Sequence, residues 1–300
     1  MRKISLLMAL VLLLGAVLAS CGGREYKAYP VDPNYGGESG DTDSKVVTIS
    51  SLDGSRKYKL ENEISKIVCF APEAGIIIRA LGSASLITAA DNNTSKVISV
   101  QNVITEDAIA SQNADIVFIS DTYDADSLFT EDTVYITVPA SMTINDTKAL
   151  ISVIEKALRS DKKLEDEIDN KIELAQQTTK DYVNKYPLFI DLGSFRTSGS
   201  GTYINEVIGI CGGENVFADQ EGFLTVTKDQ IIAANPYFIF TTDDVSSYLS
   251  DSQFKELDCV KENRVFKLEA FKLNYASNML ADVISDIFEK IESVKNAGKN

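Results

Sequence analysis

A glycine-rich stretch in the second half of the chain has the residue types of a phosphate-binding loop. It reads TSGSGTYINEVIGICGGENVF, from Thr197 to Phe217. A dinucleotide fingerprint needs G-x-G-x-x-G, and Gly199 and Gly201 fit it, but the third position is Ile204. A phosphate P-loop ends in Gly-Lys-Ser or Gly-Lys-Thr, which this stretch lacks. We therefore do not expect a nucleotide here.

The composition also limits the chemistry that the chain can perform. Among its 300 residues there is no histidine and no tryptophan. Without histidine the chain cannot form a Ser-His-Asp triad, a Cys-His dyad or an imidazole zinc site. No pair of carboxylates stands in a recognisable catalytic motif, so we assign no catalytic residue, no metal ligand and no cofactor. The net charge of -15 argues against nucleic acid as a partner.

The N-terminus has the pattern of an export signal. Two basic residues precede a short apolar run, which closes in LASC at residues 18–21. This ending resembles a bacterial lipobox, which predicts a lipoprotein signal peptide over residues 1–21 and lipid on Cys21. An ordinary signal peptide with a chance cysteine is the alternative. Residues 22–45 are rich in Gly, Asp, Ser and Pro and predict a flexible tether.

Strands and helices alternate after the tether. Two alternating runs flank Asp53-Gly54 and predict a hairpin. Short apolar strands in KIVCFAP, ASLITAAD and DIVFIS are separated by helical segments, one of which ends at Gly82. This order predicts an N-terminal α/β lobe with a parallel sheet over residues 46–145. The same pattern restarts with LFIDLG and predicts a C-terminal α/β lobe over 187–300.

The segment between the lobes, residues 146–186, is almost purely helical. We expect Ser160 or Asp161 to cap a helix of about 25 residues, or roughly 37 Å, that Pro187 stops. Its apolar side chains form one narrow stripe, which suits a strut across two bodies better than a buried helix. The stripe consists of Leu164, Ile168, Ile172, Ala175 and Tyr182.

Two segments suggest that the lobes are copies of one plan. TEDAIASQNADIVFIS from Thr105 aligns without a gap with TKDQIIAANPYFIFTT from Thr227, and each combines a short helix with a strand. Within the opening glycine-rich stretch, Thr202 is expected to cap a helix that Gly212-Gly213 ends. The loop ahead of Thr202 then lies at a sheet edge, where open α/β sheets bind ligands.

These motifs together resemble the ABC-transporter substrate-binding proteins of the cobalamin and iron-siderophore class. GSGTYINEVIGICGGENVFAD, TVTKDQIIAANPYFIF and KIVCFAPEAGIIIRALG follow the order and spacing of that family over nearly the whole mature chain. The resemblance implies two Rossmann-like lobes with parallel sheets, bridged by one long helix. It also implies a ligand in the cleft between the lobes, with no catalysis. We therefore expect a lipid-anchored, monomeric receptor outside the cytoplasmic membrane that delivers an iron-siderophore or related metal chelate to a permease dimer with its ATPase.

The resemblance places the ligand contacts in loops at the strand ends. Where the cobalamin binder has pocket tryptophans, this chain has Gln101, Ser120 and Phe223, which favours a siderophore over a corrinoid. Arg196 and Lys272 could pair with an anionic chelate or be surface charges. Haem is a third ligand candidate. The expected ligand-binding residues are Phe70, Glu73, Asp91, Gln101, Tyr123, Ser194, Phe195, Arg196, Phe223 and Lys272.

The resemblance also implies one docking carboxylate for the permease on each lobe. Asp107 and Asp229 occupy the same place in the two copies, and Glu106 could share the role of Asp107. Helix capping is the alternative, since an acidic residue after Thr is typical of a helix start. Two other functional classes stay open: an extracytoplasmic hydrolase that uses carboxylates, and a sensor domain that reports to a kinase.

Overall fold

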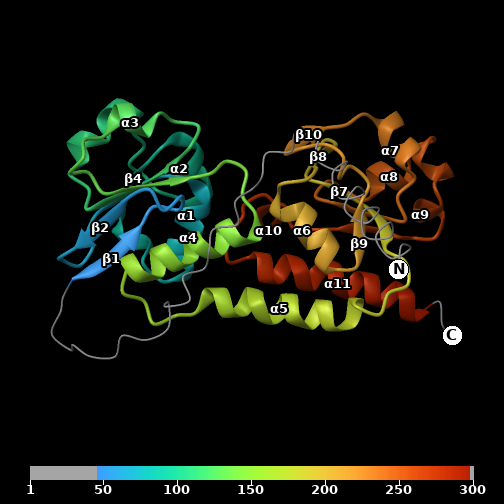
Figure 1. The fold of residues 1–300 in the computed structure, drawn as a ribbon. Helices are drawn as coiled ribbons and strands as arrows, with labels where there is room; N and C mark the ends of the chain where they lie inside the picture. Colours follow the sequence, from blue (N-terminus) through green and yellow to red (C-terminus); the bar gives the residue numbers. More distant parts are fainter. Residues whose placement is uncertain (1–45, 298–300) are drawn as a thin grey trace, which may run out of the picture. The chain divides into compact units, whose positions relative to one another are not determined.

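The computed structural model describes residues 46–297, so the expected signal peptide, Cys21 and the tether lie outside it. The described part has two α/β lobes, each with a four-stranded parallel sheet (Figure 1). We call residues 46–143 the N lobe and residues 186–297 the C lobe. The expected fold class, two α/β lobes with parallel sheets, is confirmed.

The N-lobe sheet has the strand order β4-β3-β5-β6, and all its pairs are parallel. Side chains alternate across it: Ile67 and Cys69 face one hydrophobic cluster, while Val68 and Phe70 face another. The expected hairpin around Gly54 is confirmed, and Gly54 has a positive φ of 70°. The strands are β1 Val47–Ser50, β2 Lys57–Leu60, β3 Ile67–Phe70, β4 Ile87–Ala90, β5 Ile116–Ser120 and β6 Tyr135–Val138.

The C-lobe sheet repeats this topology. Its order is β12-β11-β7-β9, so in both lobes the first strand lies between the second and the third, and the fourth is at the edge. Two further strands, β8 and β10, form an antiparallel pair. The C-lobe strands are β7 Tyr186–Asp191, β8 Arg196–Ser198, β9 Gly213–Asn215, β10 Phe223–Thr225, β11 Phe238–Thr241 and β12 Val265–Lys267.

The two aligned segments occupy equivalent positions. Each contains the third strand of its sheet and the helical turns before it. Asn113 and Asn235 end these turns in the left-handed conformation, with φ of 48° and 45°. Asparagine tolerates this conformation better than most residues, which explains why both copies carry it. The N-lobe copy differs from the expected short helix, because it forms two 3₁₀ turns, Glu106–Ala108 and Ala110–Gln112. The C-lobe copy is helix α7, Lys228–Ala234.

Two helices connect the lobes, and the second is shorter than the expected strut. Helix α4 spans Ile144–Ala157, and α5 spans Leu164–Thr179, which is 16 residues instead of about 25. The expected cap is also wrong, because neither Ser160 nor Asp161 caps α5. The buried Glu155 of α4 accepts a 2.8 Å hydrogen bond from the Leu164 N–H instead.

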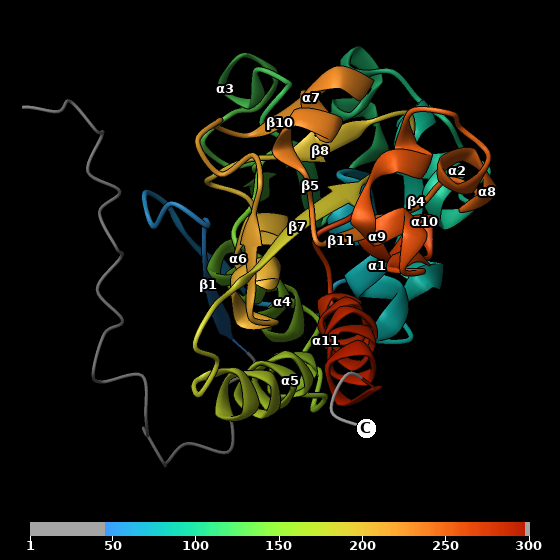
Figure 2. The same cartoon turned by 90° about the vertical axis from the view of Figure 1, so that its right-hand side faces the viewer.

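Helix α5 ends early because Tyr182 packs onto the C-terminal helix α11, Leu280–Ala297. The Tyr182 hydroxyl donates a hydrogen bond to Glu292, and the Lys295 ammonium lies 3.7 Å from its ring centroid. The expected apolar stripe is still correct along the helix, since Leu164, Ile168 and Ala175 are buried. Figures 1 and 2 show α5 and α11 side by side, so α5 is a packed helix of the fold.

The expected helix after the glycine-rich loop is confirmed as α6, Tyr203–Ile210. The Thr202 hydroxyl caps it by accepting a hydrogen bond from the Asn205 N–H, and Gly212 follows with φ of 81°. No helix within residues 46–297 is both long and apolar enough to cross a bilayer. The other α-helices are α1 Pro72–Ala80, α2 Asn92–Ile98, α3 Ala125–Leu128, α8 Ser246–Leu249, α9 Asp258–Lys261 and α10 Ala270–Leu273.

One hydrophobic core runs through both lobes. It extends from Ile77 on α1 and Ile154 on α4, through Ile168 on α5, to Val207 on α6 and Ile287 on α11. Two smaller clusters cover the opposite faces of the two sheets, one in each lobe. The lobes therefore share their largest apolar core, which ties their stability together.

We predict that Ile154→Ala lowers the free energy of unfolding of the whole chain by about 2–5 kcal/mol, because it opens a cavity in the shared core. Differential scanning calorimetry should show one transition at a lower temperature. Ile154→Val is the matched control and should cost about 0.5–1.5 kcal/mol. Two separate transitions, with only one of them moved by the alanine, would contradict a common core.

Candidate functional site

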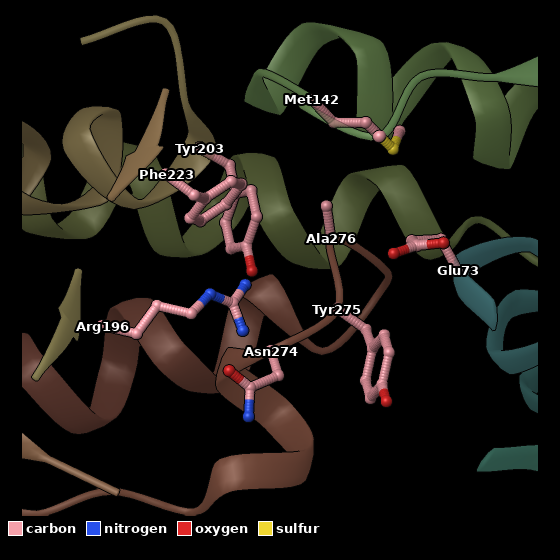
Figure 3. Close-up of a pocket in the computed structure, with 9 residues that line it drawn as sticks. Glu73, Met142, Arg196, Tyr203, Phe223, Asn274, Tyr275 and Ala276 are labelled. Carbon is pink, nitrogen blue, oxygen red and sulfur yellow. The ribbon is translucent and has the colours of Figure 1, made fainter. Parts of the chain in front are cut away.

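A cavity of about 300 Å³ lies between the two lobes. Its walls come from segments that follow the carboxyl ends of the strands in both sheets, which is where open α/β sheets bind ligands. Figure 3 shows the side chains of both lobes around this space. The lining residues are Glu73, Ala140, Met142, Arg196, Tyr203, Phe223, Asn274, Tyr275 and Ala276.

Arg196 supplies a positive charge to this cavity. It begins β8, and its pairing with Thr225 of β10 places it beside Phe223. The guanidinium carbon lies 5.2 Å from the Phe223 ring centroid, a cation–π distance. No carboxylate within residues 46–297 forms an ion pair with Arg196. Its charge is therefore available to an anionic group in the cavity.

Glu73 brings a carboxylate to the N-lobe wall. It lies in the first turn of α1, directly after Pro72, where the helix N-terminus favours negative charge. Burial nevertheless raises the pKa of Glu73 above its ordinary value. It forms no ion pair with any residue of the described chain. A ligand that offers a hydrogen-bond donor or a positive charge to Glu73 would stabilise the carboxylate.

The remaining polar groups of the cavity come from α6 and from the segment after α10. The buried Tyr203 hydroxyl donates a 2.6 Å hydrogen bond to the Leu273 carbonyl, which fixes its ring beside Phe223. The amide oxygen of Asn274 is buried and accepts no hydrogen bond within residues 46–297. An unpaired buried acceptor is costly, so this oxygen is suited to accept a hydrogen bond from a ligand.

Three of the expected ligand-binding residues meet in the cavity: Glu73, Arg196 and Phe223. Three others lie together in the N lobe, outside the cavity lining. Phe70 is buried, its ring centroid is 5.5 Å from that of Tyr123, and the Tyr123 hydroxyl donates a 3.1 Å hydrogen bond to Asp91.

The other four expected residues also lie outside the cavity lining. Gln101 is exposed after α2. Ser194 and Phe195 form the loop before β8, and the Phe195 ring packs into the C lobe against Tyr248 and Phe254. The Lys272 ammonium lies within 4 Å of three carboxylates. These belong to Glu269, Asp282 and Asp286.

Sequence reasoning did not single out several residues of the cavity. Asn274 and Tyr275 lie in a loop that the resemblance pointed to, but loop membership does not show which side chain faces inward. Tyr203 carried a usable signal, because it directly follows the Thr202 helix cap at the edge of the glycine-rich loop. Ala140 and Met142 follow β6, a strand that the sequence pattern did not reveal.

The expected docking carboxylates are all exposed, one on each lobe plus Glu106. The Asp107 carboxylate accepts a 2.5 Å hydrogen bond from the Thr105 hydroxyl. On the C lobe, Gln230 rather than Asp229 completes the capping box with Thr227. Asp229 is thus not required as the capping side chain of α7.

Comparison with known proteins shows what the chain is similar to. No family model matches it. Over 97% of its length it is similar to the uncharacterised ABC transporter substrate-binding lipoprotein YvrC of Bacillus subtilis (strain 168), with 24% identity and 98% of that protein covered. Over nearly its whole length the chain is thus similar to an ABC-transporter substrate-binding protein. The resemblance expected from the sequence is therefore confirmed.

Several solved structures share the fold of this chain. A possible iron-binding periplasmic protein from Staphylococcus epidermidis has a TM-score of 0.60 and 17% identity, covering 77% of this chain and 99% of that one. The vitamin B12 binding protein BtuF of Vibrio cholerae has a TM-score of 0.59 and 18% identity, and the match covers 77% of this chain and 98% of that one. The molybdate-bound binding protein MolA of Haemophilus influenzae has a TM-score of 0.68 and 15% identity, and the match covers 83% of this chain and 91% of that one.

We predict that Glu73→Gln raises the melting temperature of the ligand-free protein at pH 7. Because burial raises the pKa of Glu73 in the folded state, the ionised carboxylate opposes folding above that pKa. As the pH falls through the folded pKa the gain should shrink, and it should vanish below the unfolded value of 4.5.

The exposed Glu63→Gln is the matched control, since it removes the same charge outside the cavity. Melting curves from pH 4 to pH 8 distinguish the two variants. A gain for Glu73→Gln that does not depend on pH would show that the amide contributes through packing and not through charge.

Proposed function

We propose that the chain is a lipid-anchored receptor that captures a small anionic metal chelate, such as an iron-siderophore, in the inter-lobe cavity. The observation that carries this proposal is the unpaired Arg196 guanidinium beside Phe223 in that cavity. Arg196 is exposed at the cavity wall, where its guanidinium can bind an anion from outside through charge-assisted hydrogen bonds. The chelate would then pass to the membrane permease of the importer.

The other polar groups of the cavity further restrict the kinds of ligand that would fit. Glu73 and the Asn274 amide oxygen are both acceptors, so the ligand should also carry N–H or O–H donors. A volume of about 300 Å³ is at the lower end for small-molecule sites, roughly 300–1,000 Å³. These features together favour a compact chelate with an anionic face toward Arg196 and a donor face toward the acceptors.

Corrinoid and haem ligands fit these features less well. The positions aligned with the pocket tryptophans of the cobalamin binder include Gln101 and Ser120, which do not line the cavity. For haem, Met142 and Tyr275 are available in the cavity as iron ligands in place of histidine. However, burial and the nearby Glu73 raise the pKa of Tyr275, which disfavours the phenolate that iron would need.

The location and the partners complete the proposal. Lipid on Cys21, outside the described residues, would hold the protein at the outer face of the bacterial cytoplasmic membrane. The protein would act there as a monomer. A permease dimer with its ATPase would receive the ligand, with Asp107 and Asp229 as one docking contact on each lobe and Glu106 beside the first.

We predict that Arg196→Ala weakens binding of an anionic ferric chelate by about 1.5–3 kcal/mol, the range for a hydrogen bond to a charged group. Isothermal titration with ferric citrate, a ferric hydroxamate, a ferric catecholate, cyanocobalamin, haemin and molybdate would identify the ligand class. Arg196→Lys should recover only part of the affinity, because it keeps the charge and loses the planar fork.

Lys59→Ala removes an exposed cation from β2 and is the matched control for net charge. Its affinity should equal that of the parent protein. Equal affinity of the parent protein and Arg196→Ala would show that Arg196 does not contribute to ligand binding. Recovery of a chemically altered ligand after binding would instead favour the hydrolase alternative.

We also predict that Asp107→Asn and Asp229→Asn together abolish uptake while leaving ligand affinity and melting temperature near those of the parent. The exchange removes two exposed negative charges with little change of shape. Reconstituted transporter should then show no stimulation of its ATPase by the double variant. Persistent uptake, with Glu106→Gln added, would contradict the docking role, and a drop of many degrees in melting temperature would favour capping.

A further inference from the structure

The loop that presents Arg196 has an unusual backbone. Gly193, Ser194 and Phe195 have consecutive positive φ angles of 107°, 55° and 60°. This conformation suits glycine but is uncommon for residues with a Cβ atom, and more so for an aromatic residue. The surrounding structure must therefore hold the loop in place.

The carboxylate of Asp191 provides this support. Asp191 ends β7, is fully buried, and accepts 2.9 Å hydrogen bonds through one oxygen from the N–H groups of Gly193 and Phe195. The intervening Ser194 N–H donates to Asp243 at 2.8 Å. The N–H groups of Gly193 and Phe195 converge on one oxygen as in an anion-binding nest, and here the chain's own carboxylate fills it.

The second oxygen of Asp191 is anchored in the C-lobe interior. It accepts hydrogen bonds from the Thr241 hydroxyl at 2.9 Å and the Tyr248 hydroxyl at 2.8 Å. Burial and the charge of Asp191 raise the pKa of Tyr248, so its hydroxyl keeps the proton that it donates. The Tyr248 ring also packs against Phe195, with centroids 6.2 Å apart.

This arrangement sets the direction of the next residue. Phe195 is held on the interior side, and the backbone of Arg196 is fixed by hydrogen bonds to Leu192 at 2.7 Å and to Gly193 at 3.1 Å. Figure 3 shows the Arg196 side chain reaching into the cavity. The orientation of Arg196 therefore depends on a carboxylate that does not line the cavity itself.

We propose that Asp191 is a positioning residue for ligand recognition: its buried carboxylate holds the 193–195 loop so that Arg196 points into the inter-lobe cavity. This rests on the proposed function only in taking Arg196 as the ligand contact. The placement of Arg196 can be tested without any ligand, so the two proposals can fail separately.

The absence of tryptophan from the sequence makes a direct test possible. In the full chain, Phe223→Trp introduces a single tryptophan beside the Arg196 guanidinium, and its fluorescence can be excited selectively above the absorption of the tyrosines. Iodide, an anion, should quench this tryptophan more strongly relative to neutral acrylamide while Arg196 is near. The readout is the ratio of the quenching constant for iodide to that for acrylamide. Adding Arg196→Ala should lower this ratio and so give its value in the absence of the cation.

Adding Asp191→Asn to the reporter should lower this ratio to the Arg196→Ala value, with native circular dichroism. Removing a negative charge would by itself attract iodide and raise the ratio, so the expected sign is not a charge effect. Ile239→Val, buried on the neighbouring β11, is the stability control and should lower the melting temperature without moving the ratio. A parental ratio in folded Asp191→Asn overturns the proposal.

Two milder variants keep the proposal testable if Asp191→Asn does not fold. Asp243→Asn weakens the hold on Ser194, and Tyr248→Phe removes one anchor of Asp191. Each should lower the ratio part of the way toward the Arg196→Ala value. Parental ratios in both variants would overturn the proposal as well.

Discussion

The shared apolar core is the constraint on which the arrangement of the two lobes depends. One face of each sheet packs into it, and the helices α1, α4, α5, α6 and α11 contribute to the same cluster. Polar contacts cross at the same place, where the Tyr203 N–H donates to the Met142 carbonyl and Glu206 accepts from the Ile144 N–H. Closely packed interiors deform little. The cavity walls are thus held at a nearly fixed separation by the same contacts that stabilise the fold.

The repeated topology explains why the cavity has walls of similar origin on both sides. Each lobe places its first strand at the centre of a parallel sheet, and the segments after the first strands carry Glu73 in one lobe and Arg196 in the other. The two aligned segments begin at Thr105 and Thr227, at the carboxyl edges of their sheets. The exposed Asp107 and Asp229 therefore lie at corresponding places in the two lobes. Two lobes of the same topology thus present a carboxylate, Glu73, and a cation, Arg196, to the same cavity.

Local patterns predicted most of the elements, and packing between distant segments decided the rest. Gly54 and Thr202 have roles that neighbouring residues alone determine, and both were predictable. The early end of α5 depends on Tyr182 meeting α11, more than a hundred residues away, and no local signal reveals that contact. The site shows the same limit: Arg196 and Tyr123 both belong to strand-end loops, but Tyr123 bonds Asp91 while Arg196 enters the cavity. Side-chain direction is set by tertiary contacts that the sequence does not display.

The charge balance of the molecule shapes how an anionic ligand would be recognised. A net charge of -15 repels anions at long range, although salt screens such fields beyond about 8 Å under physiological conditions. Attraction would therefore come from short-range contacts with Arg196 in the cavity. Because such contacts depend steeply on geometry, the orientation of one guanidinium matters more here than the number of cations. A loop held rigidly by a buried carboxylate meets that requirement, since it limits the conformations that Arg196 would lose on binding.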